Sequence, residues 1–212
     1  MSGNSEAQTT LPLSADEYER IFQVIHAVLD NRANTPHACW FFAIAGSFIL
    51  NKYHEIPARP VAGAFVICVD DAPSVISIGK NEGRKISWDK DNFHMWVQTK
   101  SHVIDFMTPI FRESVQSRLD VPRRMFQRSL DSESTSLEDI SMPGDFYTMP
   151  DPDLTKEFID DFMEHAGKVD LLQAIDAWYK PYPEPLKKMA LLDNHGKQEP
   201  LEIVAPRVQG AW

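Results

Sequence analysis

The chain has 212 residues, of which 43% are hydrophobic, 25% charged and 10% aromatic. This composition is typical of globular proteins and excludes disordered, fibrous and coiled-coil chains. Lys and Arg total 21 against 31 Asp and Glu, which gives a formal net charge of −10. Because phosphate backbones and anionic lipid surfaces should repel such a chain, we expect neither a nucleic-acid nor a membrane partner. The length fits one domain over residues 1–212.

Cysteine usage and the first residues bear on location. The chain has two cysteines, Cys39 and Cys68, and no pair of CxxC motifs, so we expect neither a disulfide framework nor a structural zinc site. Residues 1–10 contain no Lys or Arg and lead into no apolar stretch, which argues against a secretory signal. No window approaches the ~18 consecutive apolar residues of a membrane span. The sequence therefore predicts a cytoplasmic protein with reduced thiols.

Two helices are predicted in the first 50 residues. Ser14 and Glu17 form a capping box before an apolar series at helical spacing, which predicts an amphipathic helix over about residues 15–31. The segment 34–50 is apolar almost all round, which is typical of a helix buried at the centre of a domain. Cys39 would lie in about its first turn.

Four β-rich segments follow, at residues 61–69, 75–78, 93–99 and 102–107, separated by polar turns. We expect them to form an antiparallel sheet packed against the central helix. The fold class is therefore predicted to be α+β, with a core over about residues 14–109.

Periodicity weakens in the second half of the chain. Residues 110–149 have no clear pattern and include a Ser- and Glu-rich part at 131–136. The whole segment forms either a lid or wall of the cleft, or a surface excursion unconnected with the site. Helical spacing returns at 154–165 and 169–178, and Gly167 is expected to split the two helices. We expect a helical appendage over residues 150–212.

Three residues could form a nucleophilic site: Cys39 near a helix N-terminus, His94 at the start of one strand, and Asp105 on the next strand. A helix N-terminus and a neighbouring imidazolium both favour the thiolate form of a cysteine. A carboxylate beside the imidazole would fix its orientation. A single buried cysteine in an apolar helix is more often an inert packing residue than a nucleophile, so Cys39 is a candidate because of its companions and not by itself. Cys68, inside an apolar strand segment, is expected to be a core residue.

Hairpin geometry indicates whether the histidine and the aspartate can meet. A tight turn at residues 100–101 would pair Thr99 with His102 and make His94 and Asp105 diagonal neighbours on one face. Their Cβ atoms would then lie within about 7–8 Å of each other. A slip of one residue would place them on opposite faces of the sheet.

Three blocks in this order resemble the transglutaminase-like superfamily. They are IPARPVAG at residues 56–63, HMWV at 94–97 and VID at 103–105, and with Cys39 they place the resemblance over roughly residues 34–109. The resemblance implies a papain-like core, with a Cys-bearing central helix on an antiparallel sheet, and a Cys-His-Asp triad.

The expected function is that of a cysteine-dependent amide or thioester acyl-transfer enzyme acting on a peptide or small substrate. Cys39 would attack the acyl carbon, His94 would transfer the proton, and Asp105 would orient His94. Hydrolysis is favoured because water needs no acceptor pocket. Transfer to an amine, as in a transglutaminase or an N-acyltransferase, and a catalytically silent binding module on the same fold are the alternatives. No metal site and no organic cofactor are implied.

Two residues are candidates for substrate binding. Trp96 shares a strand face with His94 and would either wall the cleft or pack in the core. The oxyanion hole would use the backbone N–H of Cys39, with Asn34 or a nearby side chain as the second donor. For His37 the sequence allows two interpretations: a role beside the thiol, or a solvated position in the first turn of the helix.

Overall fold

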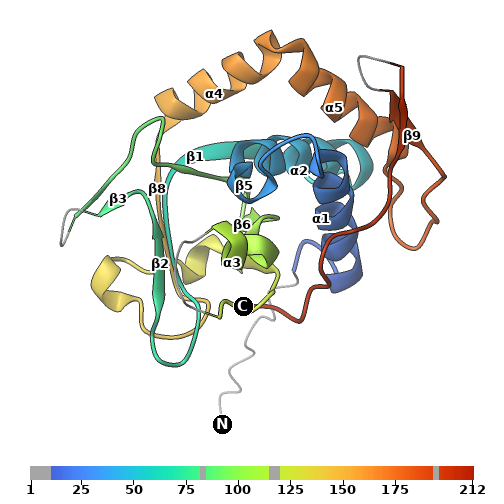
Figure 1. Ribbon diagram of the computed structural model, residues 1–212. Coiled ribbons are helices and arrows are strands. Elements are labelled where there is room, and N and C mark those ends of the chain that lie inside the picture. The colour runs from blue at the N-terminus through green and yellow to red at the C-terminus, as the bar shows by residue number, and fades with distance from the viewer. Residues whose placement is uncertain (1–10, 82–84, 115–119, 193–195) are drawn as a thin grey trace.

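The computed structural model describes residues 11–81, 85–114, 120–192 and 196–212. It has the expected α+β architecture, in which a curled antiparallel sheet packs against helices (Figure 1). The α-helices are α1 (Ala15–Leu29), α2 (Cys39–Tyr53), α3 (Phe111–Ser114), α4 (Pro152–Glu164) and α5 (Ala166–Trp178). Single 3-10 turns occupy Thr35–His37, Thr108–Ile110, Leu130–Ser132 and Leu137–Asp139.

The main sheet has the strand order β2-β1-β5-β6-β7, and β8 also pairs with β1. All of its neighbouring strands are antiparallel. Its strands are β1 (Ala58–Cys68), β2 (Val75–Ile78), β5 (His94–Thr99), β6 (His102–Asp105), β7 (Phe126–Ser129) and β8 (Phe146–Pro150). Two small ribbons pair β3 (Lys80–Asn81) with β4 (Ile86–Ser87), and β9 (Ala190–Leu192) with β10 (Gln198–Pro200).

At Gly63, the long strand β1 has two neighbouring strands. Gly63 pairs with His94 of β5 and with Pro150 of β8. A Cβ atom at Gly63 would lie 1.9 Å from the carbonyl oxygen of Met149. Only a glycine therefore allows β8 to lie this close to β1 at the position that faces His94.

Helix α1 begins where the sequence predicts. The Ser14 side chain accepts a hydrogen bond from the backbone N–H of Glu17, and the Glu17 carboxylate accepts one from the backbone N–H of Ser14 at 2.8 Å. The capping box is thus confirmed. The apolar stripe of the helix is buried, and α1 packs against α2 and α5.

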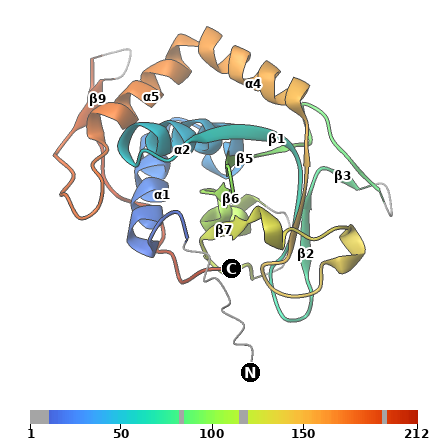
Figure 2. The same ribbon diagram turned by 180° about the vertical axis from the view of Figure 1, so that it is seen from behind.

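The predicted helix over residues 34–50 is divided in two. A 3-10 turn at Thr35–His37 ends at Ala38, whose φ of −101° and ψ of 33° are not helical, and α2 then begins at Cys39. Helix α2 packs on β1 and β5, as both views of the ribbon show (Figure 2). The packing is close, since a Cβ atom at Gly46 would lie 2.5 Å from the Phe106 ring.

The expectation that residues 110–149 are irregular is wrong at the short helix α3 and at two strands. Phe126–Ser129 forms β7 at one edge of the main sheet, and Phe146–Pro150 forms β8 beside β1. Each has only four or five residues, too few for an alternating pattern to stand out from the sequence.

The C-terminal region is only partly helical. Helices α4 and α5 meet at His165, and Gly167 lies inside α5 instead of splitting the two. After the β9–β10 ribbon, the last residues return to the core, where the backbone N–H of Trp212 donates to the carbonyl of Met125 at 3.1 Å. Over the described residues, no helix combines the length and the apolar character needed to cross a membrane.

Candidate active site

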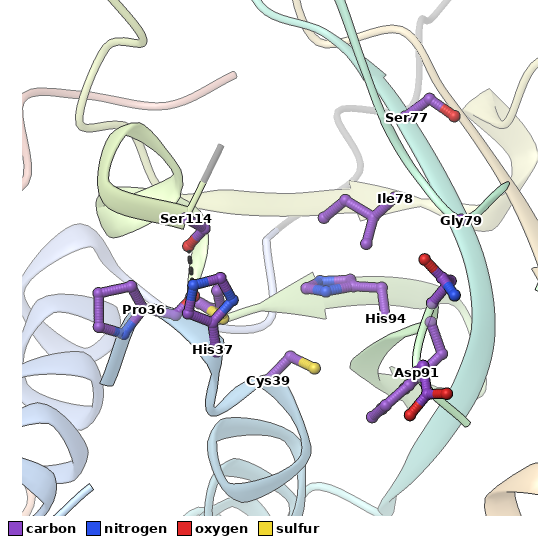
Figure 3. A pocket seen from close by; sticks show the side chains of 12 residues that line it. Pro36, His37, Cys39, Ser77, Ile78, Gly79, Asp91, His94 and Ser114 are labelled. Carbon is purple, nitrogen blue, oxygen red and sulfur yellow. Dashed lines mark hydrogen bonds between the residues drawn. The ribbon is translucent and has the colours of Figure 1, made fainter. Parts of the chain in front are cut away.

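Cys39 occupies the first position of α2 and its side chain is 7% exposed. In Figure 3 the Cys39 side chain lies next to that of His94, and an interaction with the thiol contributes to raising the pKa of the histidine. The preceding turn is held in place by α3, because the Ser114 hydroxyl donates to the carbonyl of Pro36 at 2.6 Å. The first N–H groups of a helix lack intrahelical acceptors and carry a partial positive charge. This end of α2 can therefore stabilise negative charge on the sulfur or on a bound oxygen.

His94 and Asp105 meet across β5 and β6. The strands pair Val97 with Ile104 and Gln98 with Val103, which is the register expected from the turn at residues 100–101. His94 Nε2 and Asp105 Oδ2 lie 2.7 Å apart, and both side chains are 1% exposed. The predicted contact between the imidazole and the carboxylate is therefore present in the structure.

Asp105 is fixed by three further hydrogen bonds. Its Oδ1 accepts from the backbone N–H of Met107 at 2.8 Å. Its backbone carbonyl accepts from the hydroxyls of Tyr18 and Thr108. Burial and the nearby charge of Asp105 raise the pKa of Tyr18 well above its usual value, so the phenol stays a neutral donor. Of the two carboxylate oxygens of Asp105, Oδ1 is taken by Met107, and Oδ2 is therefore available to His94.

The charge state of His94 is set by opposing effects. Burial lowers the pKa of His94, but the Asp105 carboxylate raises it through charge and hydrogen bonding, and the Cys39 thiol adds a smaller contribution in the same direction. The net effect raises the pKa of His94 well above its ordinary value. A protonated imidazole held beside a thiol favours a thiolate–imidazolium pair.

Cys39 and His94 both face one cleft of about 330 Å³. Its walls come from the turn before α2, the end of β2, the loop before β5, and the segments after β6. The lining residues are Pro36, His37, Cys39, Ser77, Ile78, Gly79, Asp91, Asn92, Phe93, His94, Met107 and Ser114. None of them is a lysine or an arginine. The cleft thus combines a thiol, an imidazole and a helix N-terminus, which is the set of groups needed for acyl transfer through a covalent thioester.

Comparison with known proteins gives a family and a related structure. The profile of DUF2026, described as a protein of unknown function, matches residues 14–212. The chain belongs to the DUF2026 family. A crystal structure described as that of genomics APC5867 shares 27% sequence identity with it and has a TM-score of 0.85, covering 99% of this chain and 100% of that chain. No protein with a curated description matches the sequence.

The two predicted substrate-binding residues of this DUF2026 protein lie outside the cleft lining. Trp96 is fully buried and packs against Phe65, with ring centroids 6.0 Å apart. It shares a strand face with His94 but lies two residues further along β5, inside the core. Asn34 is exposed before the 3-10 turn and caps nothing with its side chain.

The polar segment 131–136 also lies away from the cleft lining. The Glu133 carboxylate accepts hydrogen bonds from the backbone N–H and the hydroxyl of Thr148, both at 2.6 Å. This contact ties the segment to β8. Residues 131–136 therefore do not cover the cleft, whereas Ser114, near the start of the segment 110–149, forms part of the cleft wall.

Sequence reasoning did not single out the loop before β5. Asp91 and Asn92 line the cleft, and their place just ahead of the candidate histidine is the signal that could have drawn attention to them. The structure also places His37 in the cleft wall. Among the described residues, no group of three or more His, Cys, Asp or Glu side chains is arranged to hold a metal ion.

Proposed function

We propose that this DUF2026 protein is a cysteine-dependent hydrolase of an amide or thioester, acting through an acyl-thioenzyme. The observation that carries the proposal is the arrangement of Cys39 at the N-terminus of α2 beside the buried His94–Asp105 pair, in a cleft open to solvent. The resemblance of residues 34–109 to transglutaminase-like proteins adds to it, as does the packing of α2 on an antiparallel sheet, which suits a papain-like core.

In the acylation step, the Cys39 thiolate attacks the carbonyl carbon of the substrate. A C–S bond forms, and the backbone N–H of Cys39 can donate to the resulting oxyanion. His94 gives its proton to the leaving amine or thiolate as the bond from carbon to the leaving group breaks. The enzyme is then a thioester and His94 is neutral.

In the deacylation step, His94 takes a proton from water as the water oxygen attacks the thioester carbon. The C–S bond breaks, the acid is released, and the thiolate–imidazolium pair is restored. Asp105 holds the ring in one orientation throughout, through its bond to Nε2. The other ring nitrogen, Nδ1, is thereby left for the thiol and for the attacking water.

Selective alkylation of the cysteines tests the proposal. Iodoacetamide at neutral pH should modify Cys39 faster than a free thiol, with the adduct located by peptide mass. Cys68 is the matched control, since it is also buried and burial raises the pKa of its thiol. A Cys39→Ala chain should lose the fast reaction and a Cys68→Ala chain should keep it. Equal slow reaction of both cysteines would contradict the proposal.

The choice between hydrolysis and transfer needs a second measurement. With a p-nitrophenyl ester as acyl donor, nitrophenol release should show a burst as Cys39 is acylated, followed by slower turnover in water. Added primary amine should leave the slow phase unchanged if water is the natural acceptor. A large acceleration by amine, with an amide as product, would instead favour the acyltransferase alternative.

A further inference from the structure

The loop before β5 places one carboxylate in the cleft without a partner. Asp91 is exposed and lines the same cleft as Cys39 and His94. In Figure 3 it lies on the side of the cleft opposite the turn that carries His37. Over the described residues, the Asp91 carboxylate makes no hydrogen bond and no ion pair.

The shape of this loop is held by the hydrogen bonds of a different aspartate, Asp89. Asp89 Oδ1 accepts from the backbone N–H groups of Asp91 and Asn92, at 3.0 and 2.9 Å, and from the Asn92 side chain at 3.0 Å. The Lys80 ammonium, followed by the Asn92 side chain, holds the pKa of Asp89 well below its usual range. The carboxylate of Asp91 is therefore not needed for the shape of the loop.

Both ends of this loop are anchored to α4. The indole N–H of Trp88 donates to the Asp151 carboxylate at 2.9 Å. The ring of Phe93 stacks on Phe158 with centroids 4.0 Å apart. The backbone of Asp91 is thus held at a fixed place on the cleft wall.

Two lysines close to this loop in the sequence are engaged in ion pairs with other residues. Lys80 pairs with Asp89, and Lys90 pairs with Glu157 on α4. In the part of the chain that the structure describes, neither lysine lines the cleft and no arginine does. Among the described residues, the lining of the cleft therefore offers a ligand one carboxylate that pairs with neither of these lysines, and no lysine or arginine side chain.

We infer that Asp91 selects substrates that carry a positive charge, an ammonium or guanidinium group, close to the scissile acyl bond. The inference rests on the proposed function, because it takes Cys39 as the reacting group. The Asp91 carboxylate lines the cleft, and the low-dielectric walls of a cleft focus the field of a charge that lines it. The carboxylate therefore attracts cations and repels anions that enter the cleft. Acyl donors rich in phosphate or carboxylate are disfavoured for the same reason.

Charged thiol reagents test the inference without a known substrate. Methanethiosulfonates bearing a trimethylammonium, a methyl or a sulfonate group convert a thiol to a mixed disulfide and release methanesulfinate. The measured quantity is the ratio of the second-order rate constants at Cys39 for the cationic and anionic reagents. It is compared among the wild type, Asp91→Asn, and Asp71→Asn, which makes the same change in net charge in the exposed turn after β1.

We expect Asp91→Asn to lower the ratio about three- to tenfold, and Asp71→Asn to leave it nearly unchanged. The neutral reagent should react equally with all three chains, which shows that the thiol itself is intact. An equal change in both variants, or no change in Asp91→Asn, would overturn the inference and leave the proposed function standing. Slow reaction of Cys39 with every reagent would overturn the proposed function itself.

Discussion

Cys39 and Cys68 are both buried thiols, but their surroundings favour opposite chemistry. Cys39 stands at the positive end of α2, beside a histidine that is held by a carboxylate. Cys68 ends β1, where its sulfur is 3.4 Å from the carbonyl oxygen of Asp70, and burial raises the pKa of the thiol. The carboxylates of Asp70 and Asp145 act in the same direction as burial.

The buried histidines His94 and His102, on neighbouring strands, show the same contrast. His94 has Asp105 as a partner, which raises its pKa. His102 contacts the Ser101 hydroxyl at 2.9 Å, its Nε2 has no acceptor among the described residues, and burial lowers its pKa. Burial lowers the pKa of His102, whereas a carboxylate at hydrogen-bond distance outweighs burial at His94 and raises its pKa.

Removing the carboxylate should therefore have the largest effect. Asp105→Asn should reduce ester hydrolysis by about 10³- to 10⁴-fold, because an amide can hold His94 in the wrong tautomer and cannot stabilise its positive charge. Ser101→Ala, which removes the partner of His102, is the matched control and should leave the rate close to that of the wild type. A small loss in Asp105→Asn would mean that the pair is only structural.

The second-largest effect should come from removing a hydrogen bond that holds the backbone of Asp105. Tyr18→Phe removes a buried donor to the Asp105 carbonyl, which should lower the free energy of unfolding by about 1–2 kcal/mol and the hydrolysis rate by a few-fold. Tyr53→Phe removes a half-buried hydroxyl that donates to Asp176, away from the cleft lining. Urea unfolding should show the smaller loss for that variant, and activity should not change.

These contacts show which parts of the molecule could be predicted from the sequence. The four strands β1, β2, β5 and β6 and the register of the β5–β6 hairpin followed from β-branched runs and one tight turn. The contact between His94 and Asp105 followed from that register. The start of α2 at Cys39 did not, because it depends on a break at Ala38 that no local signal marks.

Other features depend on tertiary structure that a pattern does not encode. Trp96 shares a face with His94, but alternation says nothing about how deep a position lies in the core. The strands β7 and β8 are short, and long-range pairing decides their structure. In the sequence, Asp91 does not differ from a solvated turn residue, and only the tertiary structure places its loop beside the thiol.

The two histidines should give opposite pH dependences of stability. The folded pKa of His94 lies above the unfolded value of about 6.5. Its contribution to stability is therefore full below that pH and is lost as pH rises through the folded pKa. The folded pKa of His102 is lowered, so its contribution is full above about pH 6.5 and is lost as pH falls through the folded pKa.

Urea unfolding of His94→Gln and His102→Gln chains from pH 5 to 9 measures this difference. The stability gap between wild type and His94→Gln should narrow toward high pH. The gap between wild type and His102→Gln should narrow toward low pH. If the stability gaps of the two variants instead changed with pH in the same direction, Asp105 would not give the two histidines opposite pKa shifts.

The smallest expected effect concerns stability at the two cysteines. Cys68→Ala leaves a small cavity in a fully buried site and should cost about 1 kcal/mol of unfolding free energy, with activity retained. Cys39→Ala removes a sulfur that faces the cleft, so little packing is lost, and the change should stay within about 0.5 kcal/mol. Urea unfolding of both variants measures the two losses side by side. If Cys39→Ala instead cost more than Cys68→Ala and left hydrolysis intact, Cys39 would be the packing residue, and the contrast between the two thiols would be reversed.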